Sequence, residues 1–91
     1  GLPFNIASYG LLLHLLALEA GLDEGRLVGF LADTHIYVNH VEGLQEQLSR
    51  EPFPLPNICT APFTSIFEWR HEDSRVEDYQ HHPRIPFEVA V

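Results

Sequence analysis

The sequence predicts one small α+β domain. Its 91 residues suffice for a single domain at most, and a chain of this length buries only about two-thirds of its unfolded surface. The hydrophobic fraction of 45% is that of a globular protein rather than a disordered one. The expected elements follow the order helix, strand, helix, strand, turn, strand, without internal repeats. This irregular mixture of helices and strands is typical of the α+β class.

The first expected element is a helix over residues 3–20. Pro3 suits the first helical turn, where its missing N–H leaves no intrahelical bond unmade. Gly21 is a natural stop at the C-terminal end. Leucines surround the helix on nearly all sides, which predicts a buried central helix. They are Leu11, Leu12, Leu13, Leu15, Leu16 and Leu18.

A long strand and a second helix are expected next. Residues 26–38 are apolar early and alternate late, which predicts one long strand packed on the first helix. That strand would normally lie in a larger sheet, so its open apolar edge predicts pairing with a missing segment or self-association. A second helix is expected over about residues 40–49. Asn39 is placed to cap it, and Glu42 follows three residues later, at capping-box spacing.

The second half of the chain holds shorter elements. Residues 57–60 predict a short strand, and residues 75–79 predict another. Between them, Ser65 and Glu68 have capping-box spacing and predict a single helical turn. Residues 81–91 form a tail without a regular pattern.

Charge and composition exclude two classes of partner. The formal net charge is -8, and the five basic residues are scattered arginines. We therefore expect neither a nucleic-acid polymer nor an anionic membrane as partner. The apolar run Ile6–Ala20 is interrupted by Ser8 and His14 and is too short to span a bilayer. One cysteine excludes an internal disulfide, and no signal peptide is recognisable, so we expect a cytoplasmic protein.

Polar side chains share one face of the expected long strand. Alternate residues of a strand point to the same side, which groups Asp33, His35 and Tyr37. A histidine and a tyrosine two residues apart present an imidazole nitrogen and a phenol at neighbouring heights, which suits a ligand hydroxyl. The pattern also fits an exposed sheet face with ordinary polar residues. Spacing alone leaves both interpretations open.

Three other polar features give weaker signals. Asn5 carries an amide that can pair with a planar base edge, but asparagine is also common in the first turn of a helix. Cys59 has neither a base nor a positive field beside it in sequence, which predicts a buried, inert strand cysteine. The histidines lack the spacing of a metal site, so no metal is expected. They are His35, His40, His81 and His82.

Several segments closely resemble the C-terminal part of thymidylate synthase. The longest are GLPFNIASY at residues 1–9 and DTHIYVNH at residues 33–40. LSREPFPLP, SIFEW, HHPRI and the final VAV continue the match in the family's order and spacing. The resemblance covers essentially the whole chain. It implies a C-terminal fragment of the family's α+β fold, with residues 1–91 forming a single partial domain.

The resemblance also implies a substrate and a cosubstrate. The family makes thymidylate from deoxyuridine monophosphate (dUMP), and methylenetetrahydrofolate supplies the one-carbon unit and the reducing hydride. Asn5 falls on the residue that pairs with the pyrimidine and favours uracil over cytosine. His35 and Tyr37 fall on the pair that binds the sugar hydroxyl. Phe4 and the C-terminal Ala90–Val91 match positions near the folate, where the tail closes over the site.

The chain departs from the family pattern in three ways. The family's nucleophilic cysteine lies upstream of the segment that matches Gly1, and Cys59 does not correspond to it. The phosphate-binding arginines also lie upstream, some of them supplied across a dimer. Leu31 and Ala32 stand where the family usually has two glycines. Side chains at such places would crowd the pocket or straighten the strand.

Two functions therefore remain open. In the first, the chain is part of an enzyme, inactive alone, and works with a complementing chain or N-terminal segment or as a homo-oligomer. In the second, it is a non-catalytic truncated remnant that serves only as a binding or oligomeric assembly module. The sequence has no methionine and opens on Gly1, which is typical of a processed or truncated piece. Removal of an initiator methionine would give the same start.

Overall fold

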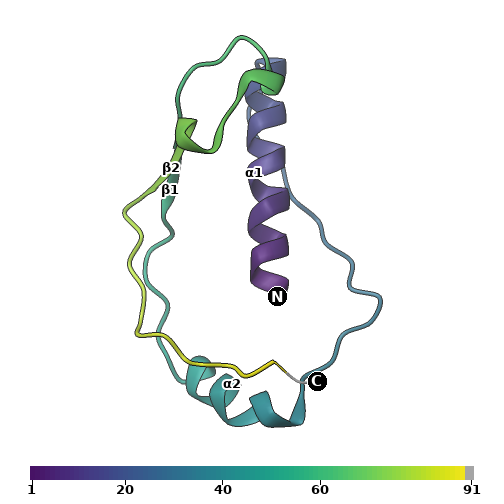
Figure 1. Ribbon diagram of the computed structural model, residues 1–91, viewed down its shortest axis with the longest axis vertical. Helices are drawn as coiled ribbons and strands as arrows, with labels where there is room; N and C mark the ends of the chain where they lie inside the picture. Colours follow the sequence, from purple (N-terminus) through teal and green to yellow (C-terminus); the bar gives the residue numbers. More distant parts are fainter. Residues whose placement is uncertain (90–91) are drawn as a thin grey trace. The chain divides into compact units, whose positions relative to one another are not determined.

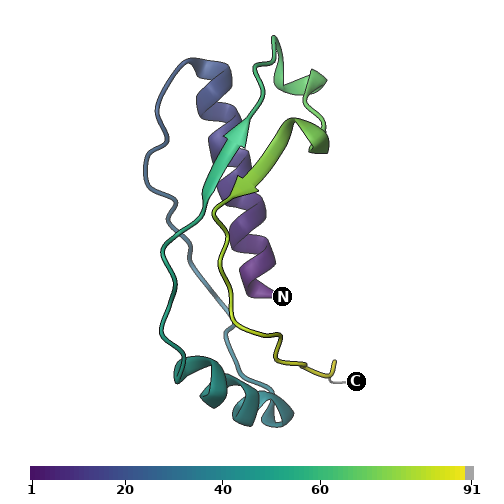
Figure 2. The same ribbon diagram turned by 90° about the vertical axis from the view of Figure 1, so that its left-hand side faces the viewer.

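A computed structural model describes residues 1–89 of the chain (Figure 1). Within them lie the helices and strands α1 (Leu2–Ala20), α2 (Val41–Leu48), β1 (Asn57–Thr60) and β2 (Ser74–Glu77). Short 3-10 turns cover Val38–His40, Ile66–Glu68 and His71–Asp73. β1 and β2 form a two-stranded sheet, and Figure 2 shows them running in opposite directions. This content confirms the predicted α+β class.

The chain divides into two compact units. The first contains Gly1–Leu31 and Thr60–Ser74. The second contains Ala32–Cys59 and the chain from Arg75 onward. α1 therefore belongs to the first unit and α2 to the second. The single partial domain expected from the sequence stays a prediction.

α1 begins and ends where the sequence predicts. Pro3 lies in its first turn, as the missing N–H of proline allows. Gly21 ends the helix with φ 66° and ψ 34°, the left-handed conformation that glycine adopts without strain. The Gly21 N–H bonds to the carbonyl oxygens of Ala17 and Leu18. Gly21 thus satisfies carbonyl groups that the end of the helix would otherwise leave unpaired.

The expected burial of α1 is not confirmed. Leu15 and Ala17 are the buried residues of this helix, whereas Leu12 and Leu16 are 45% and 49% exposed. A helix that is apolar on all sides needs packing partners on every side. The described residues cover only part of its surface.

The length of α1 bears on the expectation that the run Ile6–Ala20 does not span a bilayer. By length and composition, Leu2–Ala20 is long and apolar enough to cross a membrane. The shorter run Ile6–Ala20 was expected to be too short for this. The difference arises because the helix begins several residues before Ile6. Core helices of soluble proteins pass the same test, so this observation is weak evidence for a membrane span.

The expected long strand over residues 26–38 is not formed. Residues 22–37 are irregular, with a bend at residues 32–33, and a 3-10 turn begins at Val38. A strand persists only when its backbone N–H and C=O groups pair with a neighbouring strand. Within residues 1–89, β1 and β2 pair only with each other. Residues 26–38 therefore have no neighbouring strand with which to form hydrogen bonds, despite their alternating pattern.

The shorter elements agree more closely with the sequence analysis. β1 coincides with the predicted strand over residues 57–60, and β2 overlaps the one predicted over residues 75–79. Ser65 caps the turn Ile66–Glu68, because its hydroxyl oxygen accepts a hydrogen bond from the Phe67 N–H at 3.3 Å. Both strands and the capped turn were visible in local sequence signals.

α2 forms as predicted, but its start differs. Asn39 lies inside the turn Val38–His40 and is not a cap. The residues at the cap positions of the turn and of α2 are Tyr37 and His40, and neither makes a side-chain capping bond. The expected capping box of Asn39 and Glu42 is therefore wrong, because the 3-10 turn occupies the residues just before the helix.

A polar network lies on α1 in the first unit. His14 Nδ1 bonds to Glu24 Oε1, and His14 Nε2 lies 2.9 Å from Thr60 Oγ1. Thr60 Oγ1 lies 2.8 Å from Ser74 Oγ, which accepts a hydrogen bond from Trp69 Nε1 at 2.9 Å. The network joins α1 to the strand residues of its own unit. It also explains how an apolar helix carries a histidine.

Candidate functional site

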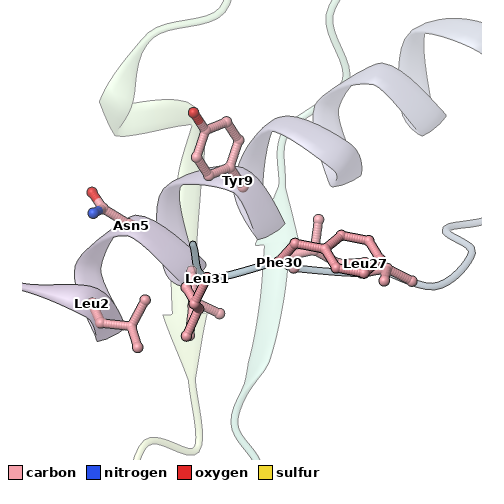
Figure 3. A pocket seen from close by; sticks show the side chains of 9 residues that line it. Leu2, Asn5, Tyr9, Leu27, Phe30 and Leu31 are labelled. Carbon is pink, nitrogen blue, oxygen red and sulfur yellow. The ribbon is translucent and has the colours of Figure 1, made fainter. Parts of the chain in front are cut away.

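Asn5 lines an open pocket of the first unit. The pocket has a volume of about 620 Å³ and lies between the first turns of α1 and residues 27–31 (Figure 3). Its polar side-chain groups are the amide of Asn5 and the hydroxyl of Tyr9. The apolar lining consists of Leu2, Ile6, Leu27, Val28, Phe30 and Leu31. Such a site suits a flat, largely apolar ligand that a few polar groups orient.

Leu31 lines the same pocket as Asn5 (Figure 3). Its side chain is 58% exposed. Leu31 is one of the two residues expected from the resemblance to stand where the family usually has glycine, and the other, Ala32, lies in the bend of the second unit. The Leu31 side chain lines the pocket that Asn5 also lines, whereas a glycine at this position would have no side chain there.

Of the predicted folate contacts, Phe4 lies within residues 1–89. Phe4 lies on α1 and is 80% exposed, and it is not among the residues that line the pocket of Asn5. Ala90 and Val91 lie outside the described residues. The folate contacts therefore stay predictions.

His35 and Tyr37 lie together in the second unit, although no strand holds them. Their ring centroids are 5.2 Å apart and the rings meet edge to face, at 85°. His35 Nδ1 lies 3.3 Å from Asp33 Oδ1. A neutral His35 whose Nδ1–H donates to Asp33 presents Nε2 as an acceptor. The side chain of His35 is 57% exposed and Tyr37 is 48% exposed, so about half of each is accessible to solvent.

The aromatic contacts continue beyond this pair. Tyr37 and His40 have ring centroids 5.4 Å apart, and His40 and Phe87 have centroids 5.1 Å apart. His40 Nε2–H also donates to the carbonyl oxygen of Glu88, which is 48 residues further along the chain. The sequence analysis missed His40 and Phe87 as neighbours of the site. The spacing of Tyr37 and His40 was the available signal, since residues three apart face the same side of a helical turn.

Asn5 and the His35–Tyr37 pair belong to different units. The first unit positions Asn5 at its pocket, and the second unit brings His35 and Tyr37 together. Their union in one nucleotide site stays a prediction.

Cys59 lies on β1 and is half-buried. Its thiol donates to Glu77 Oε2 at 3.1 Å, and this bond to a carboxylate raises the pKa of Cys59 above its ordinary value. The same bond, together with the Arg75 guanidinium 2.7 Å away, lowers the pKa of Glu77. The thiolate, which is the reactive form, is disfavoured. The predicted position on a strand is confirmed, the predicted full burial is wrong because Cys59 is only half-buried, and the inertness stays a prediction.

Several histidine nitrogens of the second unit bond to backbone carbonyl groups. His82 Nε2 lies 2.8 Å from the carbonyl oxygen of Glu51, and His81 Nδ1 lies 2.9 Å from that of His82. Among residues 1–89 there is no group of three or more His, Cys, Asp or Glu residues placed to hold a metal ion.

Comparisons with known proteins point to one family. A family model described as thymidylate synthase matches residues 1–91. The curated thymidylate synthase of Mycoplasma pneumoniae is 48% identical over 91 residues, which are 100% of this chain and 32% of that relative. The chain thus spans about a third of the length of the curated relative, 32%.

Proposed function

The chain belongs to the thymidylate synthase family, and we propose that it forms the C-terminal, nucleotide-binding third of an enzyme that methylates dUMP to dTMP. In this proposal it is inactive alone. The polypeptide that supplies the other two-thirds of the family fold completes the site. The observation that carries the proposal is the His35–Tyr37 contact, with centroids 5.2 Å apart and both side chains about half exposed.

His35 and Tyr37 hold the sugar of the nucleotide. An imidazole nitrogen accepts a hydrogen bond from a sugar hydroxyl, and the phenol both donates and accepts. The Asp33 carboxylate, 3.3 Å from His35 Nδ1, favours the tautomer in which Nε2 is the acceptor.

Asn5 reads the pyrimidine. A primary amide pairs a donor and an acceptor with the edge of uracil, which presents an adjacent acceptor and donor. The apolar lining of its pocket supports this role, because a planar base buries its faces against apolar side chains.

Methylenetetrahydrofolate is the cosubstrate of the family, and we propose that Phe4, Ala90 and Val91 contribute to its site. Phe4 is 80% exposed, so its ring is accessible to a ligand or to a covering segment. Cytoplasmic location and an oligomeric or complemented assembly complete the proposal.

The chemistry must come from the rest of the fold. Cys59 is bonded to Glu77, and its raised pKa makes it a poor nucleophile. Arg50 and Arg75 bond to Glu46 and Glu77, which makes them poorly placed to bind a phosphate. The exposed leucines of α1 offer apolar surface for the remaining part of the family fold to cover.

A chimeric enzyme tests the proposal. The matching third of the Mycoplasma pneumoniae thymidylate synthase is replaced by this chain, and release of tritium from C5-labelled dUMP is measured. We expect turnover by the chimera and none by the 91-residue chain alone. Turnover by the pure chain would contradict the proposal.

Two variants of the chimera test the residue roles. His35→Ala should raise the KM for dUMP by roughly tenfold, since a lost hydrogen bond in the site is worth about 1.4 kcal/mol. His81→Ala is the matched control, because His81 pairs with Tyr79 two residues before it, at 5.1 Å, outside the proposed site. Equal effects of the two substitutions would remove the proposed role of His35.

The second candidate function is a non-catalytic remnant that binds or assembles without turnover. The Leu31 side chain at the pocket of Asn5 is the observation that favours it. A chimera that folds, binds no dUMP and gains activity from Leu31→Gly with Ala32→Gly would support this reading. An active chimera without these changes would exclude it.

A further inference from the structure

His40 contacts two different parts of the second unit. Its ring lies against Tyr37, with centroids 5.4 Å apart at 81°, and against Phe87, with centroids 5.1 Å apart at 66°. Its Nε2–H donates to the carbonyl oxygen of Glu88. A rotation of the imidazole therefore changes both ring contacts and the hydrogen bond together.

Gly43 makes room for the segment that His40 binds. A Cβ atom at residue 43 would lie 2.7 Å from Phe87 Cε1 and 3.2 Å from Ile85 Cγ2. Glycine is unfavourable within a helix relative to alanine, yet α2 has glycine where the Phe87 ring approaches its backbone. Residues 85–88, here called the 85–88 segment, are therefore fitted closely to α2.

Other bonds hold the neighbouring chain without reaching the site. Arg50 Nη1 donates to the carbonyl oxygen of Pro83 at 2.7 Å, and His82 Nε2 bonds to the carbonyl oxygen of Glu51 at 2.8 Å. His40 differs from both residues because its ring also touches Tyr37.

We propose that His40 is a positioning residue that couples the 85–88 segment to the His35–Tyr37 pair. Docking of the segment fixes the imidazole, and the imidazole fixes the Tyr37 ring against which His35 packs. A sugar hydroxyl bound by the pair in turn favours the docked segment, because energetic coupling between two sites is reciprocal. This inference rests on the proposed function for the identity of the ligand, but the coupling is a property of the chain itself.

The first test uses glycine substitutions in the 91-residue chain, followed by NMR of the aromatic side chains. Gly43→Ala should displace Phe87, and we expect the ring resonances of Tyr37 and His35 to shift with it. Gly10→Ala in α1 is the matched control, since a Cβ there meets nothing within 4 Å. Displacement of Phe87 with unchanged Tyr37 and His35 resonances would overturn the coupling.

Two variants of His40 separate coupling from a general loosening of the unit. His40→Gln keeps an N–H donor for Glu88 but has no ring, and His40→Phe keeps a ring but has no donor. In His40→Gln, which loses the ring contacts to Tyr37 and Phe87, Gly43→Ala should no longer shift the His35 resonances, whereas His40→Phe should retain part of the shift. A loosening of the whole unit would make the Gly43→Ala shifts persist in His40→Gln as well, which would contradict a positioning role for His40.

A titration with deoxyuridine separates this inference from the proposed function. A chain that shows the coupling but does not bind deoxyuridine would contradict the function and leave the coupling intact. A chain that binds deoxyuridine through His35 and Tyr37, but whose His35 and Tyr37 resonances do not respond to Gly43→Ala, would contradict the coupling and support the function.

Discussion

The two units secure their segments by different kinds of hydrogen bond. In the first unit, side chains bond to other side chains in one continuous series. Its members are Glu24, His14, Thr60, Ser74 and Trp69. Trp69 Nε1–H can only donate and an ionised Glu24 can only accept, so the direction of the bond at each end of the series is fixed. Loss of a central member therefore disturbs the whole series.

In the second unit, the side chains that hold the tail and the segment after α2 together bond to backbone carbonyl groups. Each bond has its own donor and its own acceptor. The donors are Arg50, His82 and His40. Loss of one donor leaves the other bonds in place. The first unit therefore links its segments through one side-chain network, whereas the second unit holds its tail through separate bonds to backbone carbonyl groups.

The largest expected effect comes from a substitution that breaks the hydrogen-bonded series of the first unit at His14. His14→Ala removes two hydrogen bonds and should lower the free energy of unfolding by about 2 kcal/mol, at about 1 kcal/mol for each bond. His82→Ala in the second unit removes one exposed bond and should cost about 0.5 kcal/mol. Urea unfolding, followed by Trp69 fluorescence and circular dichroism, measures both. Equal losses would contradict the contrast between the units.

Acid should weaken the first unit through Glu24. Its bond to His14, and then its own backbone bond, lower the pKa of Glu24 in the folded chain. A lowered pKa stabilises the fold above the unfolded pKa of about 4.3, and this contribution is lost as the pH falls through the lower folded value. Glu24→Gln should therefore be less stable than the wild type at pH 7, and the gap should narrow progressively as the pH falls below the unfolded pKa. Urea midpoints over this pH range measure this, and a constant gap would argue against it.

A smaller effect concerns Cys59 in the second unit. Since the bond to Glu77 raises the thiol pKa, Glu77→Gln should lower that pKa and accelerate alkylation by iodoacetamide several-fold at pH 8. Glu68→Gln serves as the control, because Glu68 lies in the turn Ile66–Glu68 of the other unit. An unchanged alkylation rate in Glu77→Gln would show that the carboxylate does not control the thiol.

Local signals in the sequence predicted most of the elements. Pro3 and Gly21 bound α1, and Ser65 caps its turn, because these effects depend on a few neighbouring residues. The strand over residues 26–38 failed because pairing depends on a partner distant in sequence. Asn39 failed as a cap because the 3-10 turn before α2 leaves no trace in the capping pattern.

The sequence predicted part of the candidate site as well. His35 and Tyr37 do lie together, although an irregular segment rather than a strand holds them. His40 was hidden because its partner Glu88 is 48 residues away and offers only a backbone carbonyl, which any residue has. The sequence does not show that Leu31 and Asn5 line the same pocket, because they are 26 positions apart in the chain.

The central claim is that His35 and Tyr37 bind a sugar hydroxyl, and a pair of nucleosides tests it most directly. The 91-residue chain is titrated with deoxyuridine and with 2′,3′-dideoxyuridine, which lacks the 3′-hydroxyl, at millimolar concentrations that allow for the missing phosphate contacts. We predict that deoxyuridine shifts the ring resonances of His35 and Tyr37 and that dideoxyuridine does not. Equal shifts by both nucleosides, or shifts at Tyr79 and His81 instead, would contradict the claim.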